Sequence, residues 1–153
     1  ITVAELVSRG RHPHHGLLSR WSPGDDQAVA EALDATQTAD LAERPVDELS
    51  GGQRQRVWIA MALAQQTDLL LLDEATVGLD VKSRAEVLAL TRSLIASEGV
   101  SALWATHILD EIQPDDDLVI LHKGRVLNSG KAAAVSGQAG LTQAFLSLTG
   151  AAA

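Results

Sequence analysis

Four consecutive leucines followed by two carboxylates are the feature that most restricts how this 153-residue chain can fold. The segment "DLLLLDEA" has no polar alternation over residues 69–72, which predicts a strand buried on both faces, as in a parallel sheet. A second apolar run, "VSALWAT" at residues 100–106, predicts another strand of this kind. Helical patterns precede and separate the two runs, so the expected fold is α/β, with a mostly parallel sheet covered by helices.

Capping signals mark the starts of several expected helices. Thr2 and Glu5 have the T-x-x-E spacing of a capping box, and Ser83 and Glu86 repeat it before a helix that runs to about residue 97. The stretch "RGRHPHHGLLSRWSPGDD" is rich in Gly, Pro and Ser and predicts a loop. Either aspartate at its end can cap a helix with a buried face that carries Ala28, Val29, Ala32 and Leu33. Near the carboxyl end, "DLVILHKGRVLNSG" predicts two strands joined at a Lys-Gly turn.

Composition excludes several classes of function. Twelve basic and twenty acidic residues give a net charge of −8, which argues against general binding to nucleic acid or to anionic lipid. The chain has no cysteine, so disulfides and thiolate metal sites are excluded. No apolar run approaches the roughly 20 residues of a membrane-spanning helix. The chain begins with Ile1 rather than Met, and we expect the natural start to lie upstream.

Asp73 and Glu74 follow the first apolar run directly. Ligands of open parallel sheets bind beyond the carboxyl ends of the strands. Two carboxylates at that edge suit two tasks, since one can hold Mg²⁺ through water and the other can orient or deprotonate an attacking water. The competing interpretation is a strand that simply leads into a polar loop.

Two further features are candidates for phosphate binding. Ser50, Gly51, Gly52 and Gln53 open a helical pattern, and glycines at a helix amino terminus let the backbone approach an anion. The alternative is an ordinary capped helix start. His107 ends the second apolar strand, where an imidazole could donate to a phosphate oxygen, although a lone histidine is more often structural or merely exposed.

The order of these segments carries a resemblance to a family. "LSGGQRQR", then "LLLLDEA", then "GLD" at residues 78–80, then "ATH" ending at His107, resembles the signature motif, Walker B, D-loop and switch histidine of the ATP-binding-cassette (ABC) ATPases. The resemblance covers nearly the whole chain, but only the carboxyl-terminal part of a complete cassette. It implies an incomplete P-loop NTPase fold, with part of the helical signature subdomain in residues 1–65 and the carboxyl-terminal part of a RecA-like core in residues 66–153.

The resemblance also implies a role for each motif residue. Asp73 would organise Mg²⁺ through water, Glu74 would act on the hydrolytic water, and His107 would contact the γ-phosphate of ATP. Asp80 would contact a second cassette in a head-to-tail dimer. The lid over the ATP held by that facing cassette would be formed by Ser50, Gly51, Gly52 and Gln53.

One element of the family pattern is not found in the sequence. No G-x-x-x-x-G-K-[ST] loop precedes Lys82, Lys123 or Lys131, and the glutamine loop and the adenine-stacking aromatic are missing as well. In the family, the Walker A strand lies between the switch-histidine strand and the strand expected at residues 118–121. Unpaired strand edges cost free energy and promote aggregation. We therefore expect a chain that is marginally stable, or a sheet that closes or gapes at this point, and no ATP hydrolysis by the chain alone. Val77 also replaces a serine common in the family's D-loop region.

His12, His14 and His15 form a histidine-rich stretch, "RHPHHG". A metal site is the less favoured interpretation, since no second ligand cluster accompanies the stretch. Iron–siderophore import ATPases have a similar "GRxPH" stretch near the surface that meets the membrane subunit. The resemblance therefore implies a docking segment for a permease.

The expected function is that of an energy-coupling ATPase subunit, peripheral on the cytoplasmic face of the cell membrane, with permease subunits as partners and no nucleic acid. The front half resembles iron–siderophore importers. The back half, "DEATVGLD" and "LWATH", is closer to a subgroup associated with quinoprotein alcohol oxidation. Uptake of siderophores or iron chelates is the preferred transport function. The alternatives are a non-catalytic cassette that lends its signature motif or binds a protein, and a soluble ABC ATPase of DNA repair or translation.

Overall fold

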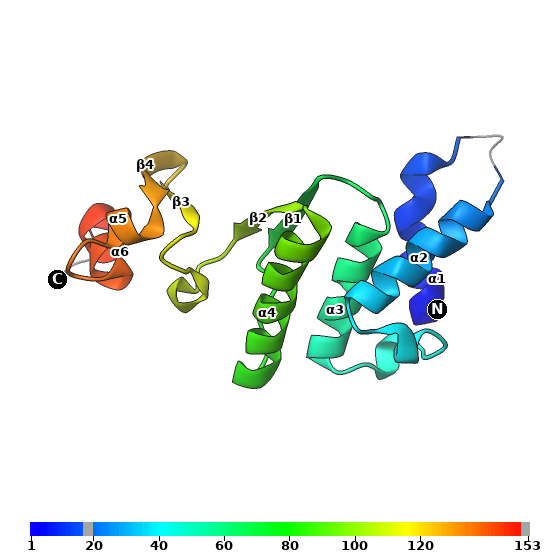
Figure 1. Ribbon diagram of the computed structural model, residues 1–153. Coiled ribbons are helices and arrows are strands. Elements are labelled where there is room, and N and C mark those ends of the chain that lie inside the picture. The colour runs from blue at the N-terminus through cyan, green and yellow to red at the C-terminus, as the bar shows by residue number, and fades with distance from the viewer. Residues whose placement is uncertain (17–19, 151–153) are drawn as a thin grey trace. The chain divides into compact units, whose positions relative to one another are not determined.

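The computed structural model describes residues 1–16 and 20–150 and divides into two units, Ile1–Ala105 and Thr106–Ala153. Each unit has its own secondary structure (Figure 1). The first unit contains α1 (Val3–Ser8), η1 (Arg9–His14), α2 (Pro23–Ala35), η2 (Ala39–Leu41), η3 (Val46–Glu48), α3 (Gly51–Leu63), β1 (Leu69–Asp73), α4 (Val81–Glu98) and β2 (Ser101–Ala105). The boundary predicted at residues 65/66 stays a prediction.

The amino-terminal helices pack around one apolar cluster. Thr2 and Glu5 form the predicted capping box, in which Glu5 Oε2 accepts the Thr2 N–H at 2.8 Å. A 3₁₀ helix, η1, follows where the sequence predicted only loop, so that part of the prediction was wrong; residues 17–19 of the same stretch lie outside the described residues. The predicted buried face of α2 is confirmed, and its residues pack with α1 and α3 in a cluster that includes Val3, Val7, Val29, Ala32, Leu33, Val57 and Ala60.

Strands β1 and β2 form a parallel pair in the first unit. Leu69 pairs with Ser101 and Asp73 with Ala105, so both strands end at the same edge. Helices α3 and α4 cover one face of the pair (Figure 1). The cluster beneath them contains Ile59, Leu70, Leu72, Ala75, Val87, Leu90 and Leu94. The parallel sheet with flanking helices is therefore confirmed.

The opposite face of the same two strands is exposed. Leu71 is 69 % exposed and Leu103 is 63 % exposed, while Leu70 on the helix side is 2 % exposed. Side chains alternate between the two faces of a strand, and α3 and α4 lie on one face only. The prediction that the leucine run is buried on both faces was therefore wrong for this structure, because the described residues supply no layer for the second face.

This asymmetry predicts unequal effects of neighbouring substitutions. Leu72→Ala removes a side chain that is 7 % exposed and is expected to lower the free energy of unfolding by about 2–4 kcal/mol. Leu71→Ala, one position away in the same strand, is expected to change it by less than about 1 kcal/mol. Urea denaturation of both variants measures the difference. Equal losses would show that both faces of β1 are covered in solution.

The second unit is built on an antiparallel hairpin. It contains η4 (Leu109–Glu111), β3 (Asp117–His122), β4 (Arg125–Lys131), α5 (Ala132–Ser136) and α6 (Leu141–Thr149). Lys123 and Gly124 both have positive φ, 48° and 74°, as a two-residue hairpin turn of type I′ requires. The predicted Lys-Gly hairpin is confirmed. Within the described ranges, β3 pairs with β4 and β2 pairs with β1, so the strands form two separate sheets.

Candidate functional site

Ser50 and Gln53 cap each other at the start of α3. Gln53 donates its N–H to Ser50 Oγ at 3.3 Å, and Ser50 donates its N–H to Gln53 Oε1 at 3.0 Å. This reciprocal pair is a capping box, which was the competing interpretation of these two residues. We call residues 50–53 the signature segment. Ser50 and Gly51 are exposed, so the capped helix start faces solvent and is accessible to a ligand or partner.

Asp80 begins α4 in the same manner. Its carboxylate accepts the N–H of Ser83 at 3.0 Å and the hydroxyl of Ser83 at 2.6 Å. The Ser83 hydroxyl, followed by the Ser83 N–H, lowers the pKa of Asp80. The capping box predicted from Ser83 and Glu86 was wrong, because Asp80 supplies the cap three residues earlier. Asp80 is exposed at this position, where a partner surface can contact it.

The two glycines of the signature segment lie against the segment around Asp80. Gly51 approaches the tip of Leu79, and Gly52 is buried against Ser83 in the first turn of α4. The structure thus brings the signature segment and residues 78–80 together within one unit. The sequence placed both in one family pattern without predicting that they touch.

Asp73 and Glu74 lie where β1 ends, and both are exposed. The backbone of Glu74 is left-handed, with φ 48°, a conformation that costs a non-glycine residue free energy. It is held by two hydrogen bonds, since the Glu74 N–H donates to Ala105 O at 2.9 Å and Glu74 O accepts the Val77 N–H at 3.0 Å. The backbone that carries Glu74 is therefore held at the edge where β2 also ends.

His107 belongs to the second unit and is exposed. Thr106 Oγ1, immediately before it, accepts the N–H of Ile108 at 2.9 Å and forms a turn around the histidine. His107 follows β2 by two residues, as the sequence indicated. Its role as a phosphate contact stays a prediction.

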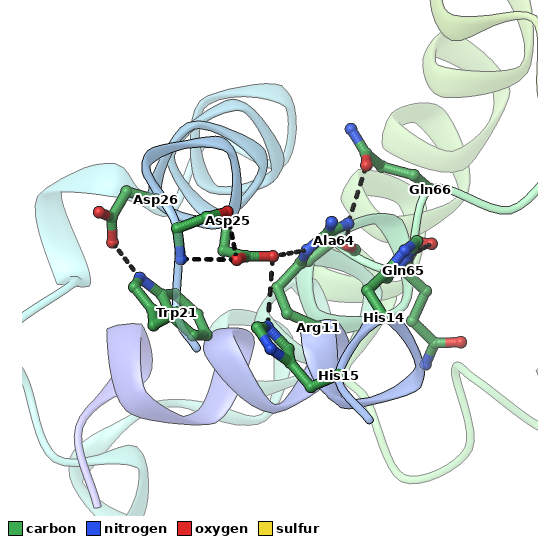
Figure 2. Close-up of polar contacts among 10 residues, drawn as sticks. Arg11, His14, His15, Trp21, Asp25, Asp26, Ala64, Gln65 and Gln66 are labelled. Carbon is green, nitrogen blue, oxygen red and sulfur yellow. Dashed lines mark hydrogen bonds and ion pairs between the residues drawn. The ribbon is translucent and has the colours of Figure 1, made fainter. Parts of the chain in front are cut away.

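The histidine-rich stretch is organised by a buried arginine. Arg11 is 7 % exposed and donates to three acceptors: Nε to Asp25 Oδ1 at 3.0 Å, and Nη1 to Ala64 O at 2.7 Å and Gln66 Oε1 at 2.8 Å. Figure 2 shows Arg11 between Asp25 on one side and Ala64 and Gln66 on the other. The arginine therefore joins η1 to the first turn of α2 and to the end of α3.

The second carboxylate oxygen of Asp25 also accepts hydrogen bonds, from Ser22. Asp25 Oδ2 accepts the N–H of Ser22 at 2.9 Å and the hydroxyl of Ser22 at 2.6 Å. The Ser22 hydroxyl, and then Arg11, hold the pKa of Asp25 well below its ordinary value. The prediction that an aspartate caps α2 needs correction, because the helix begins at Pro23 after Ser22 and Asp25 lies in its first turn.

The neighbouring histidines contact protein groups. His14 Nε2 lies 2.7 Å from Gln65 O, and His15 stacks on Trp21 with ring centroids 5.6 Å apart. His15 Nε2 is also 3.4 Å from Asp25 Oδ1. Across residues 1–16 and 20–150, no group of three or more His, Cys, Asp or Glu side chains could hold a metal ion.

Comparison with known proteins gives the family. The model of the ABC transporter family matches residues 2–77. The ferric enterobactin transport ATP-binding protein FepC of Escherichia coli is 44 % identical over 131 residues, which are 85 % of this chain and 48 % of that protein. The chain belongs to the ABC transporter ATPase family.

Other members of the ABC family agree in sequence and fold. The iron(3+)-hydroxamate import ATP-binding protein FhuC of Bacillus subtilis is 45 % identical over 146 residues, 95 % of this chain and 54 % of that protein. A solved metal-chelate type ABC transporter in an inward-facing conformation superposes with a TM-score of 0.84 at 31 % identity, covering 95 % of this chain and 58 % of its own. The chain spans about half the length of these curated relatives. In the described part of the chain no helix is long and apolar enough to span a bilayer.

Two features of the candidate ABC site were not expected from the sequence. The left-handed backbone of Glu74 gives no signal in a one-dimensional pattern, because glutamate has no preference for that conformation. The pairing of Arg11 with Asp25 joins residues 14 positions apart across a predicted loop. Its only sequence signal is the resemblance of "GRHPH" to the siderophore ATPases.

Proposed function

We propose that this chain is part of the ATP-binding subunit of an ABC importer that takes up iron–siderophore complexes. The observation that carries the proposal is the agreement of relatives named for ferric enterobactin, achromobactin and iron(3+)-hydroxamate transport, which are 44–46 % identical over most of the chain. The order of the four motifs along the chain supports an ATPase role independently of those names.

The signature segment would close over ATP held by a second, facing cassette. Its exposed start on α3 offers backbone N–H groups and the positive end of a 13-residue helix, which favour a phosphate. Asp80, exposed at the start of α4, would contact the same partner. The proposal therefore assigns both helix starts to one surface for cassette dimerisation.

The carboxylates at the end of β1 would serve the nucleotide site of this chain's own cassette. Asp73 and Glu74 are exposed oxygen donors, the type of ligand that Mg²⁺ prefers. Asp73 would hold the ion through water, and bound Mg²⁺ would neutralise charge on the ATP phosphates. Glu74, fixed by its backbone bonds to Ala105 and Val77, would orient the attacking water, with His107 near the γ-phosphate.

The printed sequence has no Walker A loop to hold those phosphates. We therefore propose that the chain alone does not turn over ATP. The second candidate function, a partner that lends its signature segment to ATP bound elsewhere, is favoured by the exposure of Ser50 and Gly51 at the start of α3.

The segment held by Arg11 is the proposed docking surface for the permease, on the cytoplasmic face of the membrane. Arg11 fixes η1 from three directions, while His12 and His14 on the same short helix remain exposed. A rigid backbone with exposed polar side chains can transmit motion between subunits without ordering costs on docking.

A chimera tests the importer function directly. The amino-terminal half of the E. coli ferric enterobactin protein, joined to residues 1–153 of this chain, is expected to restore growth on ferric enterobactin to cells that lack the native protein. Glu74→Gln in the chimera should abolish growth, because the chimera's own nucleotide site would then lack the residue that activates water. Immunoblots of the membrane fraction report the amount of chimera. A chimera present at native levels that gives no growth would contradict the siderophore assignment.

A further inference from the structure

The amino-terminal turns of α3 and α4 meet at Gly52 and Ser83. A Cβ atom added at Gly52 would lie 2.9 Å from Ser83 Cβ and 3.0 Å from Ser83 Oγ. Real Cβ atoms essentially never approach a neighbour this closely, so any side chain at position 52 must displace one of the two helices. Glycine at position 52 is thus explained by packing within the chain, before any phosphate is considered.

The contact is held firmly on the α4 side. Ser83 Cβ is attached to the first turn of α4, and the serine is held by two hydrogen bonds to Asp80. The contact at Gly51 differs, because an added Cβ there would meet only Leu79 Cδ2, at 3.0 Å, which is the flexible tip of a side chain. The size of residue 83, rather than that of residue 79, therefore sets how closely α3 approaches α4.

We infer that Ser83 is a positioning residue that couples the signature segment to residues 78–80. This inference rests on the proposed function, in which both elements face the partner cassette. Asp80 is the residue that would touch the partner, and Ser83 bonds to Asp80 while it packs on Gly52. A shift of α4 on partner contact would therefore be passed through Ser83 to the start of α3.

A thermal double-mutant cycle on the chain tests the contact. Gly52→Ala is expected to lower the melting midpoint by about 5 °C, despite the higher helix propensity of alanine. In the Ser83→Gly background, where the obstructing Cβ is gone, Gly52→Ala should no longer lower it. Ser83→Ala keeps the Cβ and should preserve the penalty, and Gly51→Ala should change the midpoint by less than about 2 °C. An equal penalty from Gly52→Ala in both backgrounds would overturn the contact.

ATP turnover tests the positioning role. The chain is mixed with the complete E. coli ferric enterobactin cassette whose own signature serine is replaced by arginine, so that turnover depends on the signature segment of this chain. Gly52→Ala should reduce turnover about tenfold or more, and should have no further effect in the Ser83→Gly background. If Gly52→Ala is equally damaging there, the ligand itself requires the glycine, and the positioning role is overturned while the proposed function holds. No turnover from the unsubstituted chain would contradict the proposed function, and the positioning role with it, while the thermal cycle still reports the contact.

Discussion

Ser50→Arg is expected to abolish the turnover that this chain supports in the mixture with the signature-disabled E. coli cassette, with a loss of at least about 100-fold. Glu74→Gln in the same chain should leave turnover within about twofold of the unsubstituted level. The unmixed chain and the disabled cassette alone should each show no turnover. Release of inorganic phosphate measures all five samples, including the mixture with the unsubstituted chain.

The opposite effects follow from which site each residue serves. Ser50 lies exposed at the start of α3, where the long arginine side chain would occupy the space that the lid needs above the facing ATP. Glu74 lies at the end of β1 and would act on ATP in this chain's own site, for which residues 1–153 contain no G-x-x-x-x-G-K-[ST] motif. Glu74→Gln, which should abolish growth supported by the chimera, should therefore leave ATP turnover by the mixture unchanged.

Ser50→Thr is the matched control that keeps the helix cap. Threonine also caps helices, so this variant should retain most of the turnover, whereas loss of the cap alone costs about 1 kcal/mol. If Glu74→Gln removes activity and Ser50→Arg does not, the two residues serve the reverse sites. If no mixture is active although sedimentation shows a complex, the proposal that this chain supplies its signature segment to ATP bound by a partner cassette is wrong.

Arg11→Met is expected to lower the thermal midpoint of the chain by about 10 °C, the largest stability effect we expect from a single polar residue. The substitution removes the guanidinium that donates to Asp25 Oδ1, Ala64 O and Gln66 Oε1. The buried carboxylate of Asp25 then keeps its contacts with Ser22 and His15 but loses its arginine. Asp26→Asn is the matched control. Asp26 follows Asp25 directly and accepts Trp21 Nε1 at 2.6 Å, but it is exposed, so its change should cost less than about 2 °C.

The pH dependence of stability tests whether the negative charge of Asp25 is what stabilises the folded chain. The pKa of Asp25 in the folded chain is below the unfolded value of about 4, so its stabilising contribution is fully present above that value. The contribution is lost as the pH falls toward the lower, folded pKa. The difference in midpoint between the unsubstituted chain and Asp25→Asn should therefore shrink below about pH 4. A difference that stays constant from pH 3 to pH 7 would show that shape, rather than charge, explains the effect.

The sequence predicted the elements whose signals are local. The capping box at Thr2, the buried face of α2 and the Lys-Gly hairpin need only neighbouring residues, and each is confirmed. The α/β fold with a parallel pair was also predictable from the two apolar runs. Burial of both faces of β1 was not, because burial depends on which elements are present to cover each face, and periodicity within one strand carries no such information.

The candidate site divides in the same way. Ser50, Gly52, Asp73, Glu74 and His107 were located by the order of family motifs, and their roles in catalysis stay predictions. The contacts that hold these residues were not predictable. The approach of Gly52 to Ser83 and the bond from Glu74 to Ala105 join segments about 30 residues apart, and only the packing of α3, α4 and β2 brings them together.

The exposed leucine face of the β1–β2 pair has a consequence for the life of the polypeptide in a cell. This face exposes an apolar surface formed by Leu69, Leu71 and Leu103. Chaperones bind surfaces of this kind, and proteases recognise damaged proteins by them. The abundance of such a chain is then governed less by how fast it is synthesised than by how soon a further layer of protein covers those leucines. Quality control would thereby match the supply of this chain to that of whatever completes its sheet.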